Sequence, residues 1–161
     1  MRYTDHRHKI KSGDLIAFRA RGFWGWLICL WTWSAYSHVG VAVWIFERLF
    51  LIEAKEGVGV RMEPLSKRGA FDHIRTEAHF DDAVGRDALM FLGKSYNYLD
   101  LARVGLKLRP KGDGFICSEF AAKIIRPVDQ DIWTGIPRSP TPANLAAYYI
   151  KHFGPATEVT P

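Results

Sequence analysis

The order of hydrophobic and polar residues predicts a run of short strands in the first half of the chain. After a turn at Ser12-Gly13-Asp14, apolar segments rich in β-branched and aromatic residues are separated by turn residues. This pattern is typical of an antiparallel meander. The predicted strands cover residues 15–19, 38–46, 49–54 and 58–62, and residues 74–80 are a further candidate.

Helical spacing of apolar residues dominates the second half. Asp81 and Asp82 suit the cap of a helix that Gly93 ends, and its apolar positions are Val84, Ala88, Phe91 and Leu92. Further helices are predicted at 98–106, from Cys117 onward, and from Thr141-Pro142, a threonine cap followed by a first-turn proline. Because strands and helices are segregated along the chain, the predicted fold class is α+β.

One stretch has to be weighed as a membrane span. Residues 22–46 contain no Asp, Glu, Lys or Arg, and this uncharged segment is about long enough to cross a bilayer. Its centre holds Ser34, Tyr36, Ser37 and His38, which are costly in hydrocarbon without partners. We therefore expect an apolar helix at 23–33 followed by a buried strand, with the Trp-rich segment 24–33 as the part that would touch a membrane surface.

Length and composition indicate one domain over residues 1–161, with its core at about 12–150. The chain is 48% hydrophobic, and its net charge of +5 favours anionic substrates or surfaces. Basic residues are not interleaved with aromatic ones, so no nucleic-acid partner is expected. The oligomeric state stays open. The charged N-terminus has no apolar signal segment, so we expect a protein that is cytoplasmic as synthesised, and export or membrane association would need another route.

The two cysteines have different surroundings. Cys29 lies in an aromatic run and is expected to be an inert buried thiol. Cys117 follows a glycine-containing loop and opens a helical pattern, so its sulfur is expected near a helix N-terminus, which favours the thiolate. His38 begins an apolar strand and Glu53 lies inside another. A sulfur, an imidazole and an orienting carboxylate are the parts of a cysteine acyl hydrolase.

Each of these residues also has an ordinary explanation. His38 could be a core histidine, Glu53 an edge-strand acid and Cys117 a small buried hydrophobe. Fifteen residues separate His38 from Glu53, so an even-numbered loop between their strands puts both on one face of the sheet. A turn at Ile45-Phe46 would set them opposite each other, and a turn at Glu47-Arg48 would shift them by four residues; the turn chemistry does not decide. We expect the cysteine helix to dock on that face.

The remaining candidates are secondary. The backbone N–H groups of Cys117 and Ser118 are candidate oxyanion donors, and Tyr36 and Tyr96 are candidates to line the cleft or donate to the oxyanion. His6 and His8 lie in a charged N-terminal tail, where a lone His-x-His pair is a weak signal for a metal site. His73 and His79 lie in a polar stretch that favours a solvated face over a metal site. No metal or organic cofactor is expected.

Several short segments resemble the circularly permuted papain-like thiol hydrolases of the NlpC-type superfamily, in its YiiX-like branch. They are Gly13-Asp14-Leu15-Ile16, Ser37-His38-Val39-Gly40, Ile52-Glu53-Ala54, Gly93 to Tyr98, Phe115 to Glu119 and Ser139 to Leu145. They occur in the permuted order, with histidine before cysteine, and span residues 13–146. The resemblance implies a papain-like core with Cys117 as nucleophile, His38 as base and Glu53 as orienting residue.

The resemblance also suggests substrates. Cell-wall enzymes of the superfamily cleave amide bonds in peptidoglycan peptides, so such an amide is the leading expectation. The permuted branch also resembles lecithin retinol acyltransferase, and with the basic charge and the Trp-rich segment this keeps a lipid acyl hydrolase or acyltransferase as the alternative. A non-catalytic, membrane-associated binding module on the same fold is the alternative of a different class.

Overall fold

The computed structural model describes residues 1–20, 35–76, 78, 88–96, 116–125, 135–137 and 140–161. Within these residues the chain forms an α+β fold around one antiparallel six-stranded sheet. The strand order is β4-β3-β2-β1-β5-β6. The strands are β1 (Leu15–Arg19), β2 (Tyr36–Ile45), β3 (Arg48–Lys55), β4 (Gly59–Pro64), β5 (Phe71–Ile74) and β6 (Thr157–Val159).

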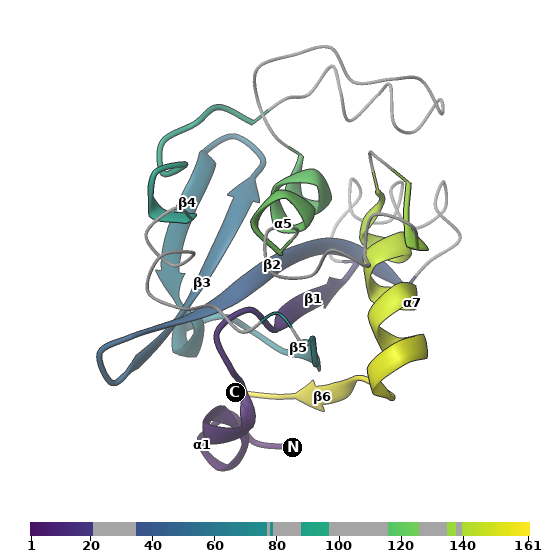
Figure 1. The fold of residues 1–161 in the computed structure, drawn as a ribbon. Helices are drawn as coiled ribbons and strands as arrows, with labels where there is room; N and C mark the ends of the chain where they lie inside the picture. Colours follow the sequence, from purple (N-terminus) through teal and green to yellow (C-terminus); the bar gives the residue numbers. More distant parts are fainter. Residues whose placement is uncertain (21–34, 77, 79–87, 97–115, 126–134, 138–139) are drawn as a thin grey trace.

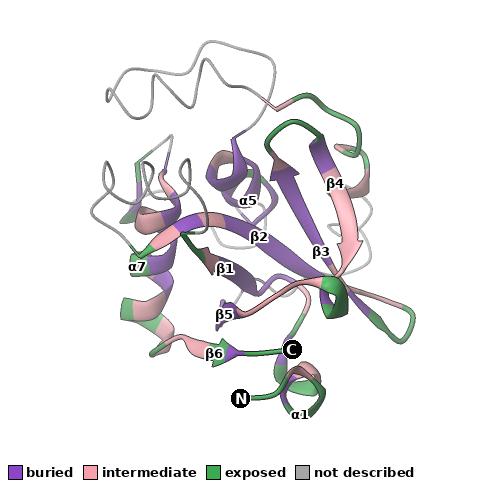
Figure 2. Cartoon of the chain, turned by 180° about the vertical axis from the view of Figure 1, so that it is seen from behind, coloured by how far each residue is buried: buried purple, intermediate pink, exposed green. Residues whose placement is uncertain are grey.

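Two described helices pack on one side of this sheet (Figure 1): α5 (Cys117–Ile125) and α7 (Pro142–Phe153). Their apolar residues join one buried cluster with Leu15, Val39 and Val41. Figure 2 shows many of the buried residues on β1, β2, β3 and α5. The α7 start is capped as predicted: Thr141 accepts from the Asn144 amide, and Asn144 returns a bond to the Thr141 backbone.

The first half follows the predicted meander closely, because its strands are apolar and separated by turns. The strands predicted at 15–19, 38–46, 49–54 and 58–62 correspond to β1, β2, β3 and β4, with ends displaced by at most a few residues. The predicted helix starts at Cys117 and Pro142 are both confirmed. The helices predicted at 23–33 and 98–106 lie outside the described residues, as do residues 83–87 of the helix predicted to end at Gly93.

The strand predicted at 74–80 is wrong in position, because β5 covers Phe71–Ile74. The error has a physical cause. The middle of β5 is Asp72 and His73, which look like surface residues in the sequence, yet both are buried. Asp72 pairs with Arg19 and His73 with Asp14, which makes their burial tolerable.

The two chain ends meet beside β6, outside the core predicted at 12–150. Helix α1 (Tyr3–His6) and the 3-10 helix η1 (Arg7–Lys9) precede β1. The Tyr3 amide donates to the Thr160 carbonyl at 2.8 Å, and the Thr160 amide donates to the Met1 carbonyl at 2.8 Å. Figure 1 shows both termini together below the sheet. None of the described helices is long and apolar enough to cross a membrane.

Candidate active site

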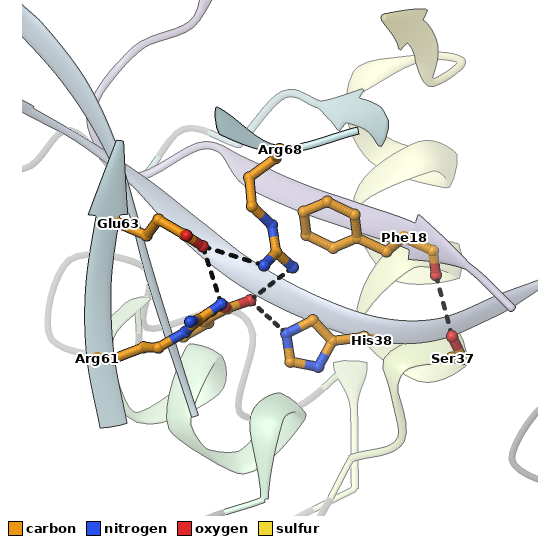
Figure 3. Close-up of polar contacts among 7 residues, drawn as sticks. Phe18, Ser37, His38, Arg61, Glu63 and Arg68 are labelled. Carbon is orange, nitrogen blue, oxygen red and sulfur yellow. Dashed lines mark hydrogen bonds and ion pairs between the residues drawn. The ribbon is translucent and has the colours of Figure 1, made fainter. Parts of the chain in front are cut away.

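His38 and Glu53 form a short polar contact between neighbouring strands. Nε2 of His38 lies 2.6 Å from Oε2 of Glu53 (Figure 3). The Glu53 side chain is fully buried, and that of His38 is 22% exposed. A buried carboxylate this close to an imidazole favours the charged form of the ring and holds its orientation.

The ladder between β2 and β3 explains how they meet. The paired residues run from Val41 with Ile52 to Ile45 with Arg48. The connection is therefore Phe46-Glu47, a two-residue loop, so the prediction that both side chains share a face is confirmed. Neither of the two predicted turn positions is correct, because this register offsets His38 from Glu53 by two residues.

Gly40 makes room for this diagonal contact. Continuing the register places Gly40 across from Glu53, between His38 and the carboxylate. A Cβ added at Gly40 would lie 2.7 Å from Cδ1 of Leu51, 2.9 Å from the Ile52 carbonyl oxygen and 3.1 Å from Cβ of Glu53. A side chain at this position would therefore push on Glu53 itself.

Two arginines also bind the Glu53 carboxylate. Arg61 lies directly opposite Glu53 on β4 and donates to Oε1 through Nε at 2.9 Å and Nη2 at 2.7 Å. Arg68 donates to Oε2 at 3.3 Å. Both arginines also bind Oε2 of Glu63, at 2.8 and 3.1 Å. Figure 3 shows the four side chains as one charged network beside His38.

This network keeps Glu53 ionised although it is buried. Burial by itself raises the pKa of Glu53, but the hydrogen bond and charge of His38, the charge of Arg68 and the bond from Arg61 lower it to about 2. The sequence pattern did not single out Arg61 or Arg68. A usable signal was present in Arg61, because an acid inside an apolar strand needs a cation on the next strand.

The imidazole also contacts Cys117. Burial lowers the pKa of His38, but the charge of a Cys117 thiolate, a hydrogen bond with Cys117 and the bond to Glu53 outweigh it and raise the pKa to about 9. Because Nε2 is bound to Glu53, Nδ1 is the ring nitrogen left for the sulfur. Cys117 is unpaired, 4% exposed, and the first residue of α5.

The sulfur approaches from the other side of β2. Cys117 packs with Val39 and Val41, which alternate with His38 and Gly40 along the strand. The expected docking of the helix on the His38 face is therefore corrected. Phe18 pairs with His38 but Arg19 pairs with Tyr36, which leaves Ser37 as an extra residue. Such a bulge bends a strand and re-aims its side chains, which accounts for the reach of His38 toward α5.

One ring surface of the site is formed by Phe18. Its ring centroid is 5.7 Å from that of His38, and the Arg68 guanidinium lies 4.6 Å from the same ring (Figure 3). The arginine thus bridges the acid and the aromatic neighbour of the histidine. This stacking restricts Arg68 to a conformation that can serve Glu53.

The secondary candidates are placed as follows. Tyr36 is hydrogen-bonded to Asp72, and burial followed by this bond raises its pKa to about 12. Tyr96 packs against the apolar cluster that includes Val60 and Phe120. Ser118 is fully buried, and in the described part of the chain its Oγ is the buried side-chain oxygen without a hydrogen-bond partner. Oxyanion roles for these residues stay predictions.

A second polar cluster lies near the chain ends. His73 Nε2 is 2.7 Å from Oδ2 of Asp14, and His73 Nδ1 is 2.9 Å from Nε2 of His6. All three side chains are buried. The expectation that His73 lies on a solvated face is wrong, because its ring is buried and hydrogen-bonded inside the fold. No group of three His, Cys, Asp or Glu within the described ranges is arranged to hold a metal ion.

Comparison with known proteins bears on the fold. No family model matches the chain, and no curated protein matches it. A crystal structure described as the metalloprotein yiiX from Escherichia coli O157:H7, DUF1105, is similar with a TM-score of 0.57 and 24% identity. The match covers 74% of this chain and 66% of that one. The YiiX part of the predicted resemblance is thus confirmed at the level of fold, whereas the papain-like, permuted and acyltransferase relations stay predictions.

Proposed function

We propose that this protein is a cysteine hydrolase that acts through an acyl-thioester on Cys117. The observation that carries the proposal is the position of His38, which is hydrogen-bonded to Cys117 on one side and to the buried Glu53 on the other. With a pKa of about 9, the ring is a cation at neutral pH and can be the partner of a thiolate.

The steps follow from this ion pair. The Cys117 thiolate attacks the carbonyl carbon, forming an S–C bond, and the carbonyl oxygen becomes an oxyanion within reach of the α5 N-terminal amides. As the C–N bond breaks, Nδ1 of His38 gives its proton to the leaving amine. The neutral ring then takes a proton from a water molecule, whose hydroxide adds to the thioester carbonyl carbon. As the C–S bond breaks, the acid leaves and the pair of thiolate and imidazolium is restored.

We place Glu53 as the group that keeps the imidazolium oriented through both steps. Arg61 and Arg68 are positioning residues, because they hold Glu53 ionised without reaching the sulfur. The substrate we favour is an amide in a bacterial cell-wall peptide. A lipid ester or amide is the alternative, and the net charge of +5 supports it because a basic protein is attracted to anionic lipids.

The test compares thiol reactivity and turnover in the same variants. Alkylation of Cys117 by iodoacetamide at pH 6 should be at least about tenfold faster than that of Cys29, and His38→Gln should remove the difference. Release of amines from cell-wall peptides, and of fatty acid from phospholipid, then separates the two substrate classes. Equal, slow alkylation of both thiols would instead favour a non-catalytic binding module.

A further inference from the structure

The tip of the β2–β3 hairpin is unlike the other turns of the sheet. It projects beyond the other described strands (Figure 1) and is exposed (Figure 2). Phe46 forms it, and this side chain is 99% exposed. Trp44 and Ile45, which lead into the turn, are only partly buried. The hairpin tip therefore carries three consecutive apolar residues, and the ring of the last one, Phe46, is almost fully exposed.

The backbone at Phe46 is itself unfavourable. Its φ is 52°, and in the described residues it is the non-glycine position with positive φ. A bulky aromatic residue is strained in this region, which glycine and asparagine adopt far more readily. A large apolar side chain held both in solvent and in a strained turn gains nothing for folding, and strain of this kind is found at functional positions.

The N-terminal segment brings positive charge to this tip. Nη2 of Arg7 donates to the Glu47 carbonyl at 2.9 Å, and its guanidinium lies 5.3 Å from the Trp44 ring. Trp44 Nε1 donates to the Ile10 carbonyl at 2.7 Å, which fixes the segment along the strand. Arg48 follows the turn, and Lys9 and Lys11 flank Ile10 in the chain. All four basic residues are exposed or half-exposed, as are the nearby acids Glu47 and Asp5.

We propose that this hairpin tip, with Phe46 as the inserting residue and Arg7, Lys9, Lys11 and Arg48 as a basic collar, docks on an anionic phospholipid bilayer. The charge is complementary to lipid phosphates, and the ring can enter the interface between headgroups. A protein partner would need roughly 1,000 Å² of contact, which a two-residue tip does not offer.

The docking surface lies far from the catalytic residues. Phe46 is eight residue steps along the strand from His38, which is about 27 Å of extended backbone. Binding at the tip would therefore hold the protein at a membrane without covering His38. This inference does not depend on the proposed hydrolase activity, so Cys117→Ala should bind vesicles as the unmodified protein does.

The experiment is co-sedimentation of the full chain with vesicles of phosphatidylcholine, alone or with about three-tenths phosphatidylglycerol. We expect binding only to the anionic vesicles, weakened by added salt. Phe46→Asn should weaken it about tenfold while the melting temperature stays equal or rises, because asparagine suits the positive φ. Arg48→Ser should weaken it about fivefold.

Val58→Ser is the matched control. Val58 is 59% exposed in the turn between β3 and β4, at the other end of β3, and its loss should leave vesicle binding unchanged. The proposal is overturned if the unmodified chain does not bind anionic vesicles, or if Phe46→Asn binds them as strongly. A DNA duplex that displaces the protein from the vesicles, equally well for the unmodified chain and for Phe46→Asn, would also overturn it.

Discussion

Glu53 reaches His38 diagonally across the ladder between β2 and β3, with Oε2 2.6 Å from Nε2, and not from the directly opposite position. Diagonal neighbours on antiparallel strands are about 7–8 Å apart, with their Cβ atoms somewhat closer, a gap that only long side chains close. The opposite position is Gly40, which carries no side chain to intervene. The contact between His38 and Glu53 therefore depends on the register of β2 and β3, on the length of both side chains and on Gly40.

Removing the sulfur should lower the pKa of His38. The value of about 9 rests on the charge and hydrogen bond of Cys117 together with Glu53, working against burial. In Cys117→Ala only Glu53 remains, so the pKa should fall by about one unit or more. Ring resonances of His38 followed by NMR against pH would measure it, with Cys29→Ala as the control that should leave the titration unchanged.

The same contact has a consequence at alkaline pH. Because the folded-state pKa of His38 is raised above 6.5, its stabilising contribution is complete below pH 6.5 and is lost as the pH rises through about 9. The free energy of unfolding should therefore fall between pH 6.5 and about 9 by more in the unmodified protein than in Cys117→Ala. Identical slopes would contradict a contact between the ring and the sulfur.

The two arginines should differ in importance. Arg61 makes two bonds to Glu53, at 2.9 and 2.7 Å, whereas Arg68 makes one at 3.3 Å. Arg61→Met should lower the free energy of unfolding by about 2–3 kcal/mol and Arg68→Met by about 1 kcal/mol, since bonds to a buried charge are strong. Urea unfolding of both, beside the exposed Arg48→Met, would test the ranking, and the reverse order would refute it.

Gly40→Ala should damage the site through Glu53. The added Cβ would lie within 3.1 Å of atoms of Leu51, Ile52 and Glu53. We expect a loss of about 1–3 kcal/mol from overpacking, with slower alkylation of Cys117 as His38 loses its partner. Gly93→Ala is the comparison: it meets no atom within 4 Å but has φ +82°, so it should cost about 1 kcal/mol and leave the thiol unaffected.

Acidification should loosen the N-terminal segment. Burial, followed by the charges of His73, Lys9, His8 and the N-terminal amine, lowers the pKa of His6. A lowered folded-state pKa means that His6 contributes stability above pH 6.5 and that this is lost as the pH falls through the folded value. Hydrogen exchange of the Tyr3 amide, which bonds the Thr160 carbonyl, should lose protection below pH 6. In His6→Gln the Tyr3 amide should be equally protected above pH 6.5 and below pH 6. If its protection still falls on acidification, the effect belongs to another group.

Local sequence patterns determined the strands and the capped helix starts. They also determined that His38 and Glu53 lie on the same face of the sheet. Alternation and capping act over a few residues, so they can be read from neighbours in the chain. The same pattern failed at β5, where Asp72 and His73 are buried because distant partners neutralise them.

Only the tertiary structure decided the rest. The register depends on Phe46 adopting positive φ, which no turn residue in the sequence signals. The bulge at Ser37 turns His38 toward a sulfur on the opposite side of β2, and Arg61 and Arg68 become partners of Glu53 only after strands pair. Charge networks and bulges join residues that are remote in the chain, and their energies depend on burial, which exists only once the whole sheet has formed.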